Sequence, residues 1–356
     1  MGRAPLSRFA RERGALFSQL EICTTGLTRF RPARPVMRVS RKQQPFRRKR
    51  VYSLEKAKTP MSRALQRREN ISGYMFMLPS LIFFVGFVLI PMVLCIWTSL
   101  TDATMNAKTA VSFVGLKNFQ QLFGDKVFLD ALWNTVVIVI VSVPAVCAFS
   151  LWVSSAIYKL NNFALSAFRC IFYLPVVTGS VAVTVVWKWM YNNYTGILNS
   201  SMKAIGLIDK NINWLGDEKY ALWCIILILF TTSVGQPIVL YVSALGNVDQ
   251  SLVEAAQVDG ATDLQVFWKI KWPQMMPTTL YIVVITTINS FQCFALIQLL
   301  TSGGSGTNTV MYHIYYTAFK LTEQAGHFGY ANAMGVVLAI CIGALSAVQF
   351  RLAKEK

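Results

Sequence analysis

Six long apolar stretches constrain the fold of this chain more than any other feature. A helix of about 20 apolar residues spans the roughly 30 Å hydrocarbon core of a bilayer, and helical hydrogen bonds satisfy its backbone there. The chain is 54% hydrophobic and 14% charged, whereas soluble domains carry about 25% charged residues. We therefore predict an all-α membrane protein with six transmembrane helices. They lie near Tyr74–Leu100, Leu132–Ile157, Ile171–Tyr191, Tyr220–Leu245, Thr278–Leu300 and Ala331–Phe350.

The basic charge is concentrated before the first stretch. Residues 1–73 hold 19 Lys and Arg against 4 Asp and Glu. Such a segment has too few apolar residues to bury a core, which predicts a basic, disordered cytoplasmic arm over residues 1–72 and a transmembrane domain over residues 73–356. No nucleic-acid-binding motif follows the arm, so we expect attraction to anionic membrane lipid and no nucleic-acid partner.

The sequence leaves two alternatives for the start of translation. From Met61 a short basic tail leads directly into the first predicted helix, and we expect translation to begin there. The Arg-rich composition of residues 1–60 is also typical of a mitochondrial transit peptide. A translated arm of the full length stays an alternative.

Arg and Lys near the helix ends predict the orientation. Arg63, Arg67 and Arg68 directly precede the first predicted helix, and Lys159 and Arg169 lie near the start of the third. Cytoplasmic loops carry an excess of such residues. We expect both termini in the cytoplasm.

The predicted spans contain no Asp or Glu. An ion-coupled carrier normally needs a carboxylate or a broken-helix ion site near the midplane, and a membrane-embedded enzyme needs clustered His, Asp or Cys, so both classes are disfavoured. The chain lacks a phosphate-binding P-loop motif, and His313 and His327 have no Cys or carboxylate cluster beside them. We predict a non-catalytic protein without a metal site or a cofactor of its own.

Polar residues inside the fifth stretch suggest a substrate path. Asn289 and Gln292 share a face, at helical spacing, with Ala295 and Leu296. Amide groups beside aromatic rings suit a sugar, whose edge offers hydroxyls and whose faces are apolar. The alternative is structural, since polar groups in membrane helices often bond one another. The candidates for the path are Asn289, Phe291, Gln292, Phe294 and, in the fourth stretch, Gln236.

The cytoplasmic loop between the fourth and fifth helices, residues 247–277, carries the strongest pattern. Ser251-x-x-Glu254 fits a capping box that starts a short helix. Gly260 suits the left-handed position that ends such a helix. We expect a helix–turn–helix with an acidic face, which fits a protein groove better than anionic lipid.

The second helix of this loop is predicted from Thr262. Thr262-x-x-Gln265 fits a second capping box. We expect the helix to run to about Lys271 and to stop before Pro273, because the residue before a proline disfavours the α conformation.

The same loop resembles the EAA signature of binding-protein-dependent ABC importer permeases. The spacing E-A-A-x-x-D-G-A-x-x-x-x-x-F-x-x-I-x-x-P-x-x-x-P is met throughout. The matching residues are Glu254, Ala255, Ala256, Asp259, Gly260, Ala261, Phe267, Ile270, Pro273 and Pro277.

Other segments over about residues 71–352 resemble the carbohydrate branch of this family, the maltose-transporter type. They include Asn134–Thr135, the Trp187–Met190 segment with Gly196 and Asn199, and Gly329–Ala331. Ser305 stands where many members have a proline after helix five, and the large second outer domain of the maltose permease is absent. Those departures put maltose itself in doubt. An amino-acid or peptide importer is the nearest alternative within the family.

The resemblance implies an ABC type I importer permease fold in a bacterial cytoplasmic membrane. Such a permease pairs with a second permease, two copies of an ATPase that uses ATP and Mg²⁺, and an extracellular or periplasmic sugar-binding protein. The EAA helix seats in the ATPase and couples its closure to alternating access for a mono-, di- or oligosaccharide. Glu254 is expected as the charged contact or the cap, Asp259 and Gly260 as the turn, and Phe267 and Trp268 as anchors. Ala255, Ala256, Ala261, Ile270 and Pro273 complete the expected coupling set.

Overall fold

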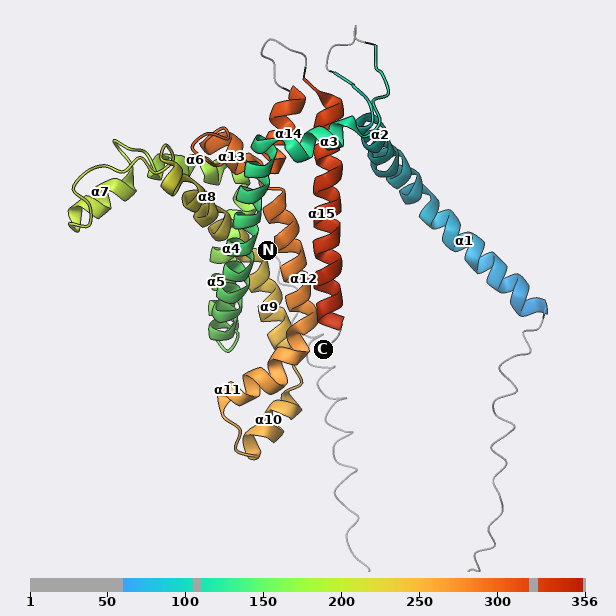
Figure 1. The fold of residues 1–356 in the computed structure, drawn as a ribbon. Coiled ribbons are helices and arrows are strands. Elements are labelled where there is room, and N and C mark those ends of the chain that lie inside the picture. Colours follow the sequence, from blue (N-terminus) through green and yellow to red (C-terminus); the bar gives the residue numbers. More distant parts are fainter. Residues whose placement is uncertain (1–59, 105–109, 320–325, 355–356) are drawn as a thin grey trace, which may run out of the picture. The chain divides into compact units, whose positions relative to one another are not determined.

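The computed structural model describes residues 60–104, 110–319 and 326–354. These residues are almost entirely helical (Figure 1). In chain order the first elements are α1 (Pro60–Phe84), the π-helical segment η1 (Val85–Leu89), α2 (Ile90–Ser99), α3 (Lys117–Gly124), α4 (Lys126–Ile157), α5 (Asn162–Thr178), α6 (Ser180–Met190) and α7 (Ile197–Ala204). They are followed by α8 (Glu218–Ser233), α9 (Gly235–Gly246), α10 (Gln250–Val258), α11 (Asp263–Val266), the π-helical segment η2 (Phe267–Lys271), α12 (Trp272–Phe291), α13 (Ala295–Leu300), α14 (Val310–Phe319) and α15 (Phe328–Lys354).

The chain divides into two compact units, Met1–Met75 and Phe76–Lys356. In the first unit the structure describes only the start of α1. Its helix covers Pro60–Ser72, where we predicted the end of a disordered arm, so that prediction is wrong for these residues. The reason is local: Arg, Leu, Gln and Glu are good helix formers, and the helix continues into the apolar stretch. Residues 1–59, including the rest of the predicted arm, lie outside the described part.

Within the described residues, four helical stretches are long and apolar enough to cross a membrane. They are 67–99, 126–157, 263–300 and 328–352. Two further pairs qualify together, each bent at a break: α5 with α6 by 95° and α8 with α9 by 42°. If each bent pair is one span, the number is six, as predicted.

The third predicted stretch is the most strongly altered. It is not one straight helix, because Gly179, with φ +85°, separates α5 from α6. Pro175 lies inside α5 just before the break. A glycine in a conformation that other residues avoid allows the sharp bend.

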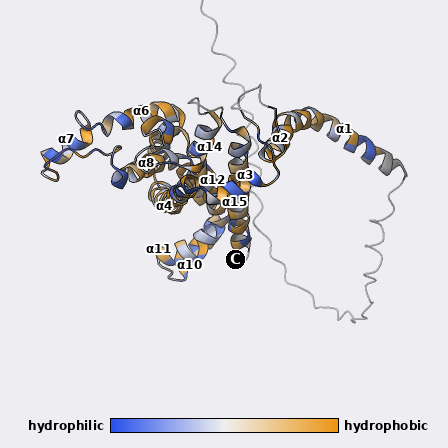
Figure 2. Cartoon of the chain, turned by 45° about the horizontal axis from the view of Figure 1, so that its top comes forward, coloured by the Kyte–Doolittle hydropathy of each residue, from blue (hydrophilic) through white to orange (hydrophobic). Residues whose placement is uncertain are grey.

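The helix α4 lies at the centre of the second unit (Figure 1). It contacts α9, α12 and α8 and contributes to the core, with Ile138, Val143 and Val146 buried. Figure 2 shows that the helices of this unit are predominantly hydrophobic. Because many of these apolar side chains are exposed, for example Val177 and Val185 on α5 and α6, the surface suits lipid or another apolar subunit.

Polar side chains inside the unit fasten segments that are far apart in sequence. The Asn134 amide on α4 donates to the carbonyl oxygens of Gly306 and Asn308, both at 2.9 Å, and the Val310 N–H donates to Thr135 at 3.1 Å. The loop 301–309 is thereby held against α4. The pair Asn134–Thr135 thus has a structural task here.

Candidate functional site

The loop over residues 247–277, which we predict to be cytoplasmic, forms a separate end of the second unit and contains α10 and α11 (Figure 1). The helix α10 begins at Gln250, and Asp249 is its N-cap. The Asp249 carboxylate accepts from the Ser251 N–H at 2.9 Å and from the Ser251 hydroxyl at 2.8 Å. The predicted capping box of Ser251 and Glu254 is therefore wrong, because Asp249 takes the capping position and Ser251 lies inside the helix. These bonds, the hydroxyl first, lower the pKa of Asp249.

The end of α10 is fixed by backbone geometry. Gly260 has φ +80°, as predicted for a left-handed position. The Ala261 N–H donates to the Ala256 carbonyl at 2.9 Å, and the Gly260 N–H donates to that of Gln257 at 3.1 Å. This pair of bonds is the Schellman motif, and it turns the chain from α10 toward α11.

The second capping box is confirmed. The Thr262 N–H donates to the Gln265 side-chain oxygen at 2.9 Å, and the Gln265 N–H donates to the Thr262 hydroxyl at 3.4 Å. The helix does not stop before Pro273, however. It continues through η2 into α12, where Pro273 lies in the first turn. A proline is tolerated in the first turn of a helix, and the Trp272 N–H bonds to the Phe267 carbonyl in the wider π turn directly before it.

The predicted coupling residues fall into an exposed set and a partly buried set. Partly buried Ala256, Ala261, Phe267 and Ile270 pack against a core of Leu245, Val248, Val253, Val266 and Met275. The exposed set is Glu254, Ala255, Asp259, Gly260, Trp268 and Pro273.

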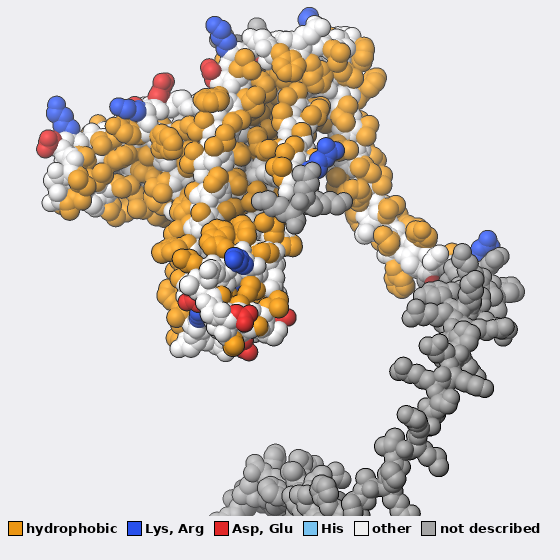
Figure 3. All heavy atoms as spheres, turned by 60° about the horizontal axis from the view of Figure 1, so that its bottom comes forward, with side chains coloured by type: hydrophobic (Ala, Val, Ile, Leu, Met, Phe, Trp, Pro, Cys, Tyr) orange, Lys and Arg blue, Asp and Glu red, His pale blue; other side chains and the backbone are white. Residues whose placement is uncertain are grey.

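Trp268 does not anchor the loop inside this chain as Phe267 does. Its side chain is 58% exposed, although its ring lies 5.3 Å from that of Phe267 and 5.6 Å from that of Trp272. Acidic and basic side chains gather at this end of the molecule, whereas hydrophobic ones cover the body (Figure 3).

A hollow lies between the two helices of the loop. Its volume is about 350 Å³, and it is lined by Ala256, Asp259, Gly260, Ala261, Gln265, Val266, Lys269 and Ile270. Its polar groups are close to the exposed turn at Gly260. The loop therefore presents the exposed face of α10 beside a small polar recess. Together they suit contact with a protein surface.

The predicted substrate path is interrupted in the structure. The helix α12 ends at Phe291, Gln292 is its C-cap, and α13 begins only at Ala295. The expected shared face of Asn289, Gln292, Ala295 and Leu296 is therefore wrong, because the residues do not belong to one helix. Nothing in the apolar pattern marks this break, since the stretch contains neither Gly nor Pro between Thr278 and Leu300.

The two phenylalanines of the path lie in different cores. Phe291 is buried in the cluster that contains Val310 and Met334, while Phe294 packs against the cluster around Ile297. The Phe294 ring also lies 4.8 Å from the ring of Tyr315 on α14. Asn289 and Gln292 are exposed, so the amides remain available to a ligand or to a second subunit.

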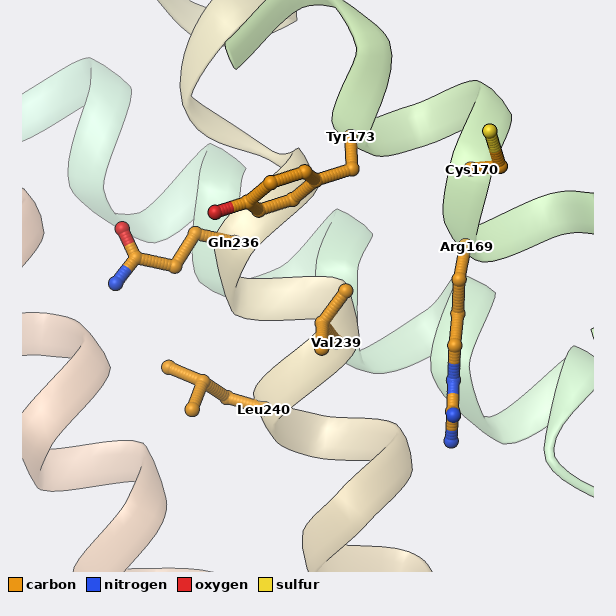
Figure 4. A pocket seen from close by; sticks show the side chains of 6 residues that line it. All are labelled: Arg169, Cys170, Tyr173, Gln236, Val239 and Leu240. Atoms are coloured by element: carbon orange, nitrogen blue, oxygen red, sulfur yellow. The ribbon is translucent and has the colours of Figure 1, made fainter. Parts of the chain in front are cut away.

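Gln236 lies apart from these residues, in a pocket between α5 and α9 (Figure 4). The pocket has a volume of about 450 Å³, and its lining is Arg169, Cys170, Tyr173, Gln236, Val239 and Leu240. Figure 4 shows the Tyr173 hydroxyl directed toward Gln236, whereas the Arg169 side chain extends along the other side of the pocket, away from both. The pocket thus has a phenol and an amide on one side, a guanidinium on the other, and an apolar lining between them.

Sequence reasoning did not find this pocket or a contact at the base of the loop. In the sequence Arg169 carries only an orientation signal, and Tyr173 carries no signal beyond its place in an apolar stretch. The Lys271 ammonium donates to the Tyr158 hydroxyl at 2.6 Å, across 113 residues of sequence. Only the fold brings this pair together.

Comparison with known proteins gives the family. Residues 68–354 match the family described as "Binding-protein-dependent transport system inner membrane component". The chain is 33% identical over 291 residues to the probable ABC transporter permease protein YesP of Bacillus subtilis, covering 80% of this chain and 91% of that protein. It is 31% identical to the lactose transport system permease protein LacF of Rhizobium radiobacter, covering 82% and 97%.

A solved structure has the same fold. It is a bacterial alginate ABC transporter in complex with an alginate pentasaccharide-bound periplasmic protein. The TM-score is 0.68 at 22% identity, with 81% of this chain and 96% of that chain covered.

Proposed function

We infer the function from the premise that this chain belongs to the binding-protein-dependent ABC transporter permeases, as a non-catalytic, multi-pass subunit of the inner membrane. We propose that it imports a carbohydrate. The relative LacF belongs to a lactose transport system, and the multiple sugar-binding transport system permease protein MsmF of Streptococcus mutans is 28% identical to this chain. The exposed amides of Asn289 and Gln292 lie at the break between α12 and α13, next in sequence to Ser290, Phe291 and Cys293. Lactose is the relative's cargo and alginate that of the structural neighbour, so a neutral or an acidic sugar is compatible with this proposal.

The coupling part of the proposal depends on the exposed turn of the loop. The helix α10 presents Glu254 and Ala255 outward, while Val253 is buried beneath them. The Schellman turn at Gly260 and the capping box at Thr262 fix the direction of the helix. In this proposal α10 seats on an ABC ATPase, and ATP-driven closure of an ATPase dimer, with Mg²⁺ bound there, moves the loop.

The remaining partners follow from the same proposal. A second permease would cover the exposed apolar face of α5 and α6, and a periplasmic sugar-binding protein would deliver the cargo at the opposite end from α10. The structural neighbour is a transporter bound to its periplasmic protein. The substrate would pass near Asn289 and Gln292, with Phe291 and Phe294 shaping the wall and Gln236 in the pocket beside α5.

Purification of the assembled complex tests the proposal most directly. The chain, tagged at its C-terminus and extracted from native membranes in mild detergent, is expected to bring down a second permease and a P-loop ATPase. Reconstituted with the binding protein, the complex should import labelled lactose, maltose or alginate oligosaccharide only with ATP inside. A chain that purifies alone and transports without ATP contradicts the proposal.

Glu254 is the residue to test first within the loop. Because Asp249 and not Ser251 caps α10, Glu254 does not form a capping box, and capping does not explain its presence in the motif. Glu254→Gln keeps size and helix propensity but removes the charge, and we expect at least a several-fold fall in ATP-driven uptake at normal membrane levels. Asp263→Asn, at another exposed acid, in the first turn of α11, is the matched control and should retain uptake. Equal uptake by both variants argues against a charged contact at Glu254.

A further inference from the structure

Besides apolar packing, a side-chain hydrogen bond joins the loop to the C-terminal end of α4. The Lys271 ammonium lies 2.6 Å from the Tyr158 hydroxyl and 4.9 Å from the centre of the same ring. Lys271 is the last residue of η2, and Tyr158 is the C-cap of α4. The ammonium therefore makes both a hydrogen bond and a cation–π contact with one residue.

The π-helical segment places Lys271 at this contact. Without a break, α11, η2 and α12 follow one another from Asp263 to Phe291. A π turn adds a residue to the helix and rotates the side chains that precede it relative to those that follow. Lys269, two residues earlier, lines the hollow near Gly260 instead, so the two lysines of the segment have different surroundings.

Tyr158 also packs against two hydrophobic cores, one in the body and one in the loop. It packs against the core of α4 and α9 that contains Val153, Ile157 and Ile238. It also packs against the loop core that contains Val253 and Val266. Tyr158 is thus the side chain shared by the loop and the body at this point.

A second fastening lies on the other side of the loop. The Asp249 N–H, at the start of α10, donates to the Gln274 side-chain oxygen on α12 at 3.2 Å. This bond ties α10 to the helix that already continues from the loop. The Lys271–Tyr158 pair differs, because it reaches a span that the loop does not continue into.

We propose that Lys271 and Tyr158 are positioning residues that transmit displacement of the coupling loop to α4. The proposal rests on the proposed function, in which an ATPase moves α10. With the pair intact, α4 follows the loop together with α12. Without it, the loop moves α12 directly while the end of α4 lags behind.

Hydrogen exchange of backbone amides tests transmission from the loop to α4. It is measured on the whole importer with a hydrolysis-deficient ATPase, with and without ATP and Mg²⁺. The readouts are peptides from the loop, residues 247–266, and from the end of α4, residues 152–162. In the unaltered complex we expect ATP to change exchange in both. In Lys271→Met we expect the loop change to remain and the α4 change to fall at least threefold.

Three further variants sharpen the result. Lys203→Met, which removes the charge of an exposed lysine on α7, is the control and should keep both changes. Tyr158→Phe retains the ring but not the hydroxyl and should lose part of the ATP-dependent change at α4. Lys271→Arg retains the cation and should keep the change that Lys271→Met loses. A merely structural role of Lys271 predicts altered exchange at α4 without ATP and no loss of the ATP-dependent difference.

The possible failures are distinguishable. If ATP changes neither peptide in the unaltered complex, the proposed coupling function fails and the transmission proposal with it. If Lys271→Met keeps the full α4 change, only the transmission proposal is overturned. If that variant no longer binds the ATPase in a pull-down, Lys271 acts in docking, and the transmission role is likewise overturned.

Discussion

The loop over residues 247–277 and the helical body of this chain are held by contacts of different range. The bonds that cap and turn the loop's own helices join residues two to five positions apart, such as Asp249 to Ser251 and Ala261 to Ala256. In the body they join distant segments, such as Ser154 to Ile238, 84 residues apart, and Asn134 to Gly306, 172 apart. The loop can therefore be altered without unfolding the body, whereas changes in the body should reduce stability first.

Close packing of α9 on α5 gives the largest expected effect. A Cβ added at Gly235 would overlap the carbonyl oxygen of Phe172, a backbone atom of another helix. Overpacking of this kind typically costs about 1–3 kcal/mol, so Gly235→Ala should lower the midpoint of thermal unfolding of the purified complex and its membrane level.

Gly246, at the other end of α9, provides the control. A Cβ there meets no atom within 4 Å, so Gly246→Ala should leave the midpoint unchanged or slightly raised. If the two variants unfold alike, the close approach of the two helices does not limit stability.

The loop over residues 301–309, which Asn134 holds against α4, gives the next effect. Asn134→Ala leaves the Gly306 and Asn308 carbonyl oxygens without their amide donor. An unsatisfied buried group costs about 1–3 kcal/mol, although partial access to water will bring this toward the lower value. We expect a lower unfolding midpoint together with faster proteolysis of loop 301–309. Asn162→Ala, at an exposed position in the first turn of α5, should change neither.

Gly260 tests the loop side of the comparison. Its φ of +80° is strained for alanine but tolerated by asparagine, and no atom lies within 4 Å of an added Cβ. Gly260→Ala should thus cost about 1 kcal/mol through the backbone alone. We expect reduced ATP-driven uptake with little change in the unfolding midpoint of the body, and substantial recovery in Gly260→Asn. Loss of body stability in Gly260→Ala would show that the loop is not independent.

The same difference in range explains what could be predicted from the sequence. Thr262, Gln265 and Gly260 act on their near neighbours, so the turn and the second cap were predicted correctly. The first cap was misplaced by two residues because Ser251 and Asp249 are both good caps and only the structure shows which one accepts the N–H.

Long-range features were not predictable in this way. The apolar stretches predict six spans, yet neither the 95° bend at Gly179 nor the break after Phe291 is marked in the apolar pattern. The pocket of Arg169, Tyr173 and Gln236 and the Lys271–Tyr158 pair join residues from separate elements, and neither spacing nor composition brings them together. The predicted helical face of Asn289 and Gln292 with Ala295 and Leu296 is divided by this break.

The smallest effect concerns pH and again separates body from loop. His313 on α14 lies 3.9 Å from the Asp125 carboxylate, which also accepts from the Tyr330 hydroxyl at 2.8 Å. Burial lowers the pKa of His313 from its ordinary value, and this outweighs the attraction of Asp125, which raises it. The folded state therefore favours the neutral imidazole. Its contribution is present above the unfolded pKa of about 6.5 and is lost as the pH falls below it.

The shifted group of the loop is an acid, Asp249, which titrates at a lower pH than His313. The pKa of Asp249 is lowered, so its contribution is lost only as the pH falls below about 4, the ordinary range of an aspartate. Between pH 7.5 and 5.5, the decline in unfolding midpoint should thus come from the body. His313→Gln should flatten this decline, while the exposed control His327→Gln should retain it. An unchanged slope in His313→Gln would mean that Asp125 compensates the burial of the imidazole in full, and the acid sensitivity of the body would then have to arise elsewhere.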